Sequence, residues 1–152
     1  MIKFKLLLST LFLLAVVLLS ACSSSSKDEK QELRICPQCN MELPKSNLHT
    51  STIDDNGKMV YFDDVGCMIL WAKDNSFDFT TIKTKIFSND TKKYINTLDA
   101  FYRVDEKTPM SYGFAAYEKE QNSTIGFEEV IMKMLRGEHM ANPKIRKQIL
   151  GY

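Results

Sequence analysis

The sequence predicts an α+β fold built from two similar halves. Two β-hairpin patterns, each followed by a helical pattern, support this fold class, and an Asn-Gly turn marks the first hairpin. The order along the chain is hairpin, helix, strand, hairpin, helix. Residues 33–152, about 120 residues, are enough for one domain with a sizeable core, but not for two large independent ones.

Residues 1–21 have the pattern of a secretory signal peptide. Lys3 and Lys5 precede an apolar run over residues 6–19, and small residues follow. The run is shorter than the roughly 20 residues that a membrane-spanning helix needs. We therefore expect export of the chain rather than a permanent transmembrane anchor.

The signal peptide ends in a lipoprotein motif. Leu19-Ser20-Ala21-Cys22 resembles the bacterial lipobox, which implies cleavage before Cys22 and acylation of that cysteine. Ser23 resembles the residue found at this position in lipoproteins that are sorted to the outer membrane. We expect a lipid-anchored protein that faces the periplasm, with Cys22 unavailable to metal. The alternative is an ordinary signal peptide followed by a chance cysteine.

Residues 22–32 are polar, low in complexity and free of aromatic side chains, which predicts a disordered tether. The folded, metal-binding domain then spans residues 33–152. The whole chain has 20 basic and 19 acidic residues, and two of the basic ones leave with the signal peptide. A nearly neutral mature chain gives no indication of nucleic-acid binding.

The first hairpin is predicted at residues 48–53 and 58–62, with Asn56-Gly57 in its turn. Asp63 or Asp64 can cap the helix that follows. Because this helix is apolar nearly all round, we expect it to be buried. Its apolar residues are Val65, Cys67, Met68, Ile69, Leu70, Trp71 and Ala72.

A strand with its lead-in is predicted at residues 77–87, and a second strand pair at residues 100–104 and 113–117. A helix with one apolar face follows and ends near Gly137. Its face consists of Phe127, Val130, Ile131, Met134 and Leu135. Asn142-Pro143 then begins a short basic helix.

The segment from Cys36 to Met41 holds two thiols and a thioether, at Cys36, Cys39 and Met41. Soft sulfur donors at this density suit Cu(I), whereas structural zinc usually recruits cysteine and histidine without methionine. Three cysteines remain once Cys22 is acylated, so a purely structural set of disulfides would leave one thiol unpaired.

A Cys-x-x-Cys turn, a hairpin and a helix with Cys67 in its first turn match the layout of a treble-clef metal site. A helix N-terminus should lower the pKa of that thiol. Met110, in an exposed-looking loop, and His49 are further candidate ligands. Three alternatives stay open: Cys67 as a buried core thiol, His49 as a solvent-exposed side chain, and Cys36 with Cys39 as a disulfide or redox pair.

The ordered set of motifs resembles the NosL family over residues 35–117. Asn40 stands where the family more often has glycine, and the resemblance supports Cys39 and Met41 better than Cys36, and Cys67 least. The motifs are Cys36-Pro37-Gln38-Cys39-Asn40-Met41, His49, Gly57, Tyr61-Phe62-Asp63-Asp64, Gly66-Cys67-Met68, Leu98-Asp99-Ala100 and Thr108-Pro109-Met110-Ser111-Tyr112-Gly113-Phe114-Ala115-Ala116.

NosL proteins are copper-binding lipoproteins that assist the maturation of nitrous-oxide reductase. The resemblance implies a pair of small ββαβ units, the first of them treble-clef-like. It also implies a Cu(I) chaperone without catalysis, which passes copper toward the reductase through an ABC-transporter-linked assembly. Cys39 and Met41 would be primary ligands, Cys36 an additional thiolate, and Met110 or His49 would complete the site.

Two other classes of protein are compatible with the same residues. A structural zinc knuckle would use Cys36, Cys39, Cys67 and His49, and would make the chain an interaction module. A thiol oxidoreductase would use Cys36 and Cys39. An organomercurial-lyase-like enzyme is conceivable from related folds, although no catalytic acid has a sequence signature.

Overall fold

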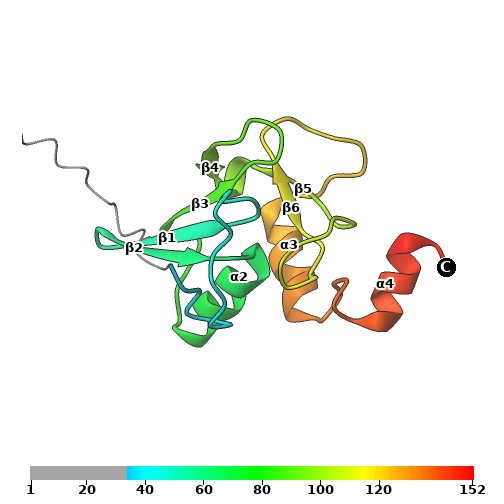
Figure 1. The fold of residues 1–152 in the computed structure, drawn as a ribbon, viewed down its shortest axis with the longest axis horizontal. Helices are drawn as coiled ribbons and strands as arrows, with labels where there is room; N and C mark the ends of the chain where they lie inside the picture. Colours follow the sequence, from blue (N-terminus) through cyan, green and yellow to red (C-terminus); the bar gives the residue numbers. More distant parts are fainter. Residues whose placement is uncertain (1–33) are drawn as a thin grey trace, which may run out of the picture. The chain divides into compact units, whose positions relative to one another are not determined.

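The computed structural model describes residues 34–152, and these residues confirm the α+β fold class (Figure 1). The predicted signal peptide, the acylation of Cys22 and the tether lie outside the described residues. Within residues 34–152, no helix is long and apolar enough to cross a membrane.

The first half of the domain is a four-stranded antiparallel sheet in the order β2-β1-β3-β4. The predicted hairpin is confirmed: Asp55 pairs with Lys58, so Asn56 and Gly57 alone form the turn. Both turn residues have positive φ, which asparagine and glycine adopt at little cost. The strands are β1 (Ser51–Asp55), β2 (Lys58–Phe62), β3 (Lys83–Phe87) and β4 (Tyr94–Asn96).

Helix α2 (Val65–Asp74) follows the hairpin and packs on β1 and β2. Asp64 is its N-cap, because its Oδ1 accepts a hydrogen bond of 3.0 Å from the Gly66 amide. The predicted burial is confirmed for most of the helix, while Leu70 and Trp71 are half-buried. The indole of Trp71 lies between the rings of Phe62 and Phe77.

Strand β3 begins only at Lys83, later than the predicted strand at residues 77–87. The Asp78 carboxylate accepts hydrogen bonds from the backbone amide and the hydroxyl of Thr80, which holds the chain in a turn at this point. Strand β4 was not predicted, since three residues are too few for an alternating pattern.

The second half contains β5 (Phe101–Arg103), β6 (Ala115–Tyr117) and α3 (Phe127–Leu135), close to their predicted positions. A 3-10 turn at Thr97–Asp99 connects β4 to β5. No strand follows α3 within residues 34–152, so this half has the order ββα rather than ββαβ. The chain ends in the predicted basic helix, α4 (Pro143–Leu150), which has no buried residue.

One hydrophobic core joins the two halves. Helices α2 and α3 pack against each other, and α3 also packs on β5. The ring of Phe127 on α3 contacts both Phe79, which follows α2, and Tyr102 of β5. The core therefore fixes the start of α2, where the candidate site lies, relative to the second half of the domain.

Candidate metal centre

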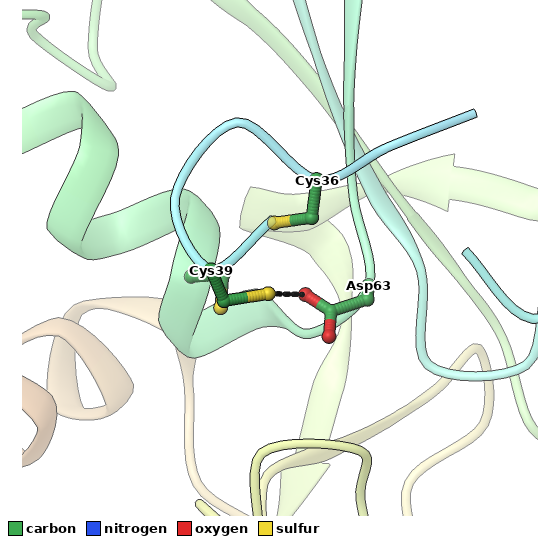
Figure 2. Close-up of side chains that lie close together, drawn as sticks. Cys36, Cys39 and Asp63 are labelled. Atoms are coloured by element: carbon green, nitrogen blue, oxygen red, sulfur yellow. Dashed lines mark hydrogen bonds between the residues drawn. The ribbon is translucent and has the colours of Figure 1, made fainter. Parts of the chain in front are cut away.

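Cys36 and Cys39 belong to a tight turn that ends at Met41. The Cys36 amide donates to the Met41 carbonyl and the Asn40 amide donates to the Cys36 carbonyl, each at 2.9 Å. Asn40 has a φ of 60°, a left-handed conformation that asparagine tolerates and that explains why glycine also suits this position. The turn directs both thiols to the same side (Figure 2).

The hairpin brings the end of β2 and the first turn of α2 to these thiols. Four side chains meet there: Cys36, Cys39, Asp63 and Cys67. One ligand atom from each lies within 4.8 Å of the others, and this is the one such group found among residues 34–152. None of these three cysteines forms a disulfide. Three sulfur atoms and one carboxylate oxygen therefore surround a common centre.

Asp63 has the most unusual surroundings of the four. Its side chain is fully buried, and the Cys39 thiol donates a hydrogen bond of 3.3 Å to its Oδ1 (Figure 2). Its Oδ2 is buried without any hydrogen-bond partner. Buried polar atoms are nearly always hydrogen-bonded, so an unpartnered carboxylate oxygen beside three thiols indicates a place for a cation.

The three thiols differ in their readiness to ionise. The hydrogen bond from the Cys67 thiol lowers the pKa of Cys36 to about 6. The same hydrogen bond, together with burial, raises the pKa of Cys67. Burial raises the pKa of Cys39 to about 11. The expectation that the helix N-terminus lowers the pKa of Cys67 is therefore wrong, because the neighbouring Cys36 thiol and burial outweigh that effect.

A loop from the second half covers the start of α2. The Met110 amide donates to Asp64 Oδ2 at 3.2 Å, and the ring of Tyr112 lies on Gly66. A Cβ atom at position 66 would be 2.2 Å from Tyr112 Cδ2, so only glycine fits there. Burial raises the pKa of the Asp64 carboxyl to about 6, although the hydrogen bonds that it accepts lower this pKa.

The structure brings together three of the six predicted metal ligands, Cys36, Cys39 and Cys67. His49 is not part of the group; burial lowers its pKa, and the charged groups that influence this pKa are Glu106 and Lys92.

The two predicted thioether ligands occupy different places. The side chain of Met41, at the end of the turn that begins at Cys36, is 45% exposed. Met110 is half-buried, and its backbone is held to the cap of α2. The roles of both methionines stay predictions.

Asp63 was missed as a site residue, although the sequence contains a signal for it. Two consecutive aspartates precede the helix, and one cap needs only one of them. The second carboxylate then lies four residues before Cys67. A spare acidic side chain so close to a candidate metal ligand is itself a candidate ligand.

No family model matches the chain, and no curated protein or solved structure does either.

Proposed function

We propose that this protein is a lipid-anchored Cu(I) chaperone that takes part in the maturation of nitrous-oxide reductase. The observation that carries the proposal is the group of three thiols and one buried carboxylate within 4.8 Å. Acylated Cys22 would hold the protein at a periplasm-facing membrane, most simply the outer membrane. The chain would perform no catalysis of its own.

The donor set favours a thiophilic cation. Cys36, Cys39 and Cys67 supply three soft donors, and Cu(I) prefers such ligands. The low pKa of Cys36 supplies one thiolate near neutral pH, and bound metal would displace the remaining thiol protons. Once Cys39 is a metal-bound thiolate, it would no longer donate a hydrogen bond to Asp63. The Asp63 carboxylate would then face the cation and help to hold it.

The exposure of the donors favours a cargo over a permanent structural ion. Cys36 and Cys67 are fully buried, Cys39 is half-exposed, and the side chain of Met41 lies at the surface of the same turn. Sulfur donors thus extend from the interior to the surface. An acceptor protein could contact Met41 and Cys39 and withdraw copper by ligand exchange, so that free Cu(I) never forms.

A structural zinc module is the second candidate, and Asp63 is the observation that favours it. A carboxylate oxygen is a better ligand for Zn²⁺ than for Cu(I), and three cysteines with one aspartate complete a tetrahedral set. Against this candidate stands the extent of the hydrophobic core. It includes side chains outside the group of four, such as Val130 and Met134 of α3, so much of the apolar interior is built by residues that would not bind the metal.

The decisive experiment is an anaerobic competition titration of residues 33–152, which form one compact unit, against a Cu(I) chelator. We expect one Cu(I) per chain, loss of stoichiometric binding in Cys39→Ser, and weaker binding in Met41→Leu, which keeps the approximate side-chain volume. Met59→Leu is the matched control, because Met59 is similarly exposed but lies in β2 near the hairpin turn.

Tightly held Zn²⁺ that resists chelators would contradict the copper proposal. So would Met41→Leu that binds Cu(I) as tightly as the parent, if removal of the metal also melted the domain. In that case the structural zinc module would replace the chaperone as the interpretation of the site.

A further inference from the structure

Two segments of the domain carry the acceptor sequence for N-linked glycosylation, Asn-x-Ser/Thr with x other than proline. They are Asn89-Asp90-Thr91 and Asn122-Ser123-Thr124. The metal centre uses neither of them. Their structural surroundings are opposite, so the structure distinguishes between them.

The Asn122 segment is open to solvent. It lies in the connection between β6 and α3, in a turn where Ser123 has a φ of 60°. Asn122 and Ser123 are both exposed, and the Asn122 amide has no hydrogen-bond partner among residues 34–152. The single side-chain hydrogen bond of Thr124, 3.0 Å to the Gln121 carbonyl, would cost about 1 kcal/mol to open.

The Asn89 segment is locked into the fold. The Asn89 amide donates to the Ala116 carbonyl at 2.8 Å, and the side-chain Oδ1 of Asn89 is buried. The Asp90 carboxylate accepts hydrogen bonds from the backbone amides of Glu118 and Lys119. A transferase could not extend this segment into its active site without breaking the contact between the β3–β4 turn and β6.

The residue two positions before each asparagine adds a second difference. Exposed Glu120 leaves the chain before Asn122 in solvent, whereas buried Phe87 holds the chain before Asn89 in the sheet. Only the Asn122 segment therefore combines the acceptor sequence with accessibility.

We propose that Asn122 is an N-glycosylation site and that Asn89 is not. The co-reactant is an oligosaccharide linked to a lipid pyrophosphate. Asn122 Nδ2 attacks C1 of the first sugar, the bond between C1 and the pyrophosphate oxygen breaks, and the N–C1 bond forms. The displaced amide proton passes to a base, the lipid pyrophosphate leaves, and no group changes oxidation state. The proposal rests on export of the chain and is independent of metal binding.

The test is mass spectrometry of tryptic peptides from the full chain, purified from membranes of the cell that makes it. Cleavage after Lys119 and Lys133 yields a peptide over residues 120–133, and cleavage after Lys85 and Lys92 yields one over residues 86–92. We expect a glycan mass on the first peptide and none on the second. The two peptides from one sample serve as site and internal control.

Three variants sharpen the test. Asn122→Gln and Thr124→Val should abolish the added mass. Ser123→Ala, which changes only the variable position, should keep it. An exported chain with an unmodified peptide 120–133, or with a glycan on peptide 86–92, would overturn the proposal. A chain that keeps its signal peptide and is unmodified would overturn export as well.

Discussion

At the scale of single residues, two neighbouring aspartates perform different tasks. Asp64 accepts hydrogen bonds from the amides of Gly66 and Met110, so each of its carboxylate oxygens has a partner. Asp63 accepts one from the Cys39 thiol and leaves its Oδ2 without a partner. The Asp64 carboxylate stabilises the start of α2. The unpartnered oxygen of Asp63 lowers the stability of the metal-free protein, and a bound cation would remove this penalty.

Asp63→Asn should weaken metal binding without destabilising the empty domain. The substitution keeps the volume of the side chain and removes a buried charge. We expect metal affinity to fall by roughly 10- to 100-fold, as for other groups that hold or orient metal ligands. The free energy of unfolding of the empty domain should stay equal or rise. Competition titration and chemical unfolding of the same sample measure both quantities.

Asp64→Ala provides the contrast. This variant should lower the free energy of unfolding by about 1 kcal/mol, because it removes the cap of α2. If Asp63→Asn instead destabilised the empty domain as much as Asp64→Ala, Asp63 would be a structural residue and not part of a metal centre.

The sequence predicted the sulfur part of the site but not its oxygen. Cys36, Cys39 and Cys67 could be brought together from their spacing, because a turn, a hairpin and a capped helix have nearly fixed geometries. Asp63 was not predicted because either of the two aspartates could cap α2. The backbone conformation at the end of β2 determines which of the two side chains points toward the thiols, and the sequence does not reveal that conformation. His49 looked suitable by spacing alone, but the structure does not include it in the group.

At the scale of elements, Asp90 connects the two sheets. It lies between β3 and β4 and accepts hydrogen bonds from the Glu118 and Lys119 amides, which follow β6. Burial raises the pKa of this carboxyl. These hydrogen bonds, together with one from Ser88, lower the pKa by a larger amount, so the net pKa is well below the usual value. The ionised form is therefore the one that stabilises the contact.

Asp90→Asn should make the stability of the domain less dependent on pH. Because the pKa of Asp90 is lowered in the folded state, its contribution is complete above about pH 4, the pKa of an unfolded aspartate, and is lost as pH falls. Asp90 is exposed, so we expect only about 1 kcal/mol at pH 7. Chemical unfolding at pH 7, 4 and 3 would test this; a difference between parent and variant that stays constant with pH would contradict it.

The elements that the sequence predicted best are those with strong local signals. Asn56-Gly57 fixed the hairpin, and a capping aspartate followed by apolar residues fixed α2. Strand β4 and the late start of β3 were not predictable in this way. Strand β4 has only three residues, which form a strand because they pair with β3. The late start of β3 follows from the turn that the Asp78 carboxylate holds.

At the scale of the whole domain, one hydrophobic core spans both halves and extends beyond the candidate metal centre. Cys36 and Cys67 belong to this core, but so do side chains of β1, β3, β5 and α3, and the rings of Tyr102 and Phe127 pack against each other in it. We therefore expect residues 33–152 without metal to give the same circular dichroism spectrum as the loaded form and to unfold cooperatively.

Metal should then act on stability through binding alone. At a free metal concentration 1,000 times the dissociation constant, the free energy of unfolding should rise by about 4 kcal/mol. Thermal unfolding with and without a chelator is the measurement. An empty domain that lacks cooperative unfolding would show that the fold depends on the ion, as in small zinc modules.

The turn from Cys36 to Met41 and helix α2 hold the candidate metal centre with different rigidity. This difference should set the rate at which bound metal dissociates. Cys36 and Cys67 are both core residues, but Cys67 lies on a helix, whereas Cys36 and Cys39 lie on a short turn whose two ends are joined to each other by the Ile35–Glu42 bridge and the Leu43–Arg34 hydrogen bond. Local opening begins where few contacts oppose it. Dissociation of the metal should therefore be limited by local opening of this turn. Substitutions in the turn should change the lifetime of the metal-bound state while the free energy of unfolding of the domain stays nearly constant.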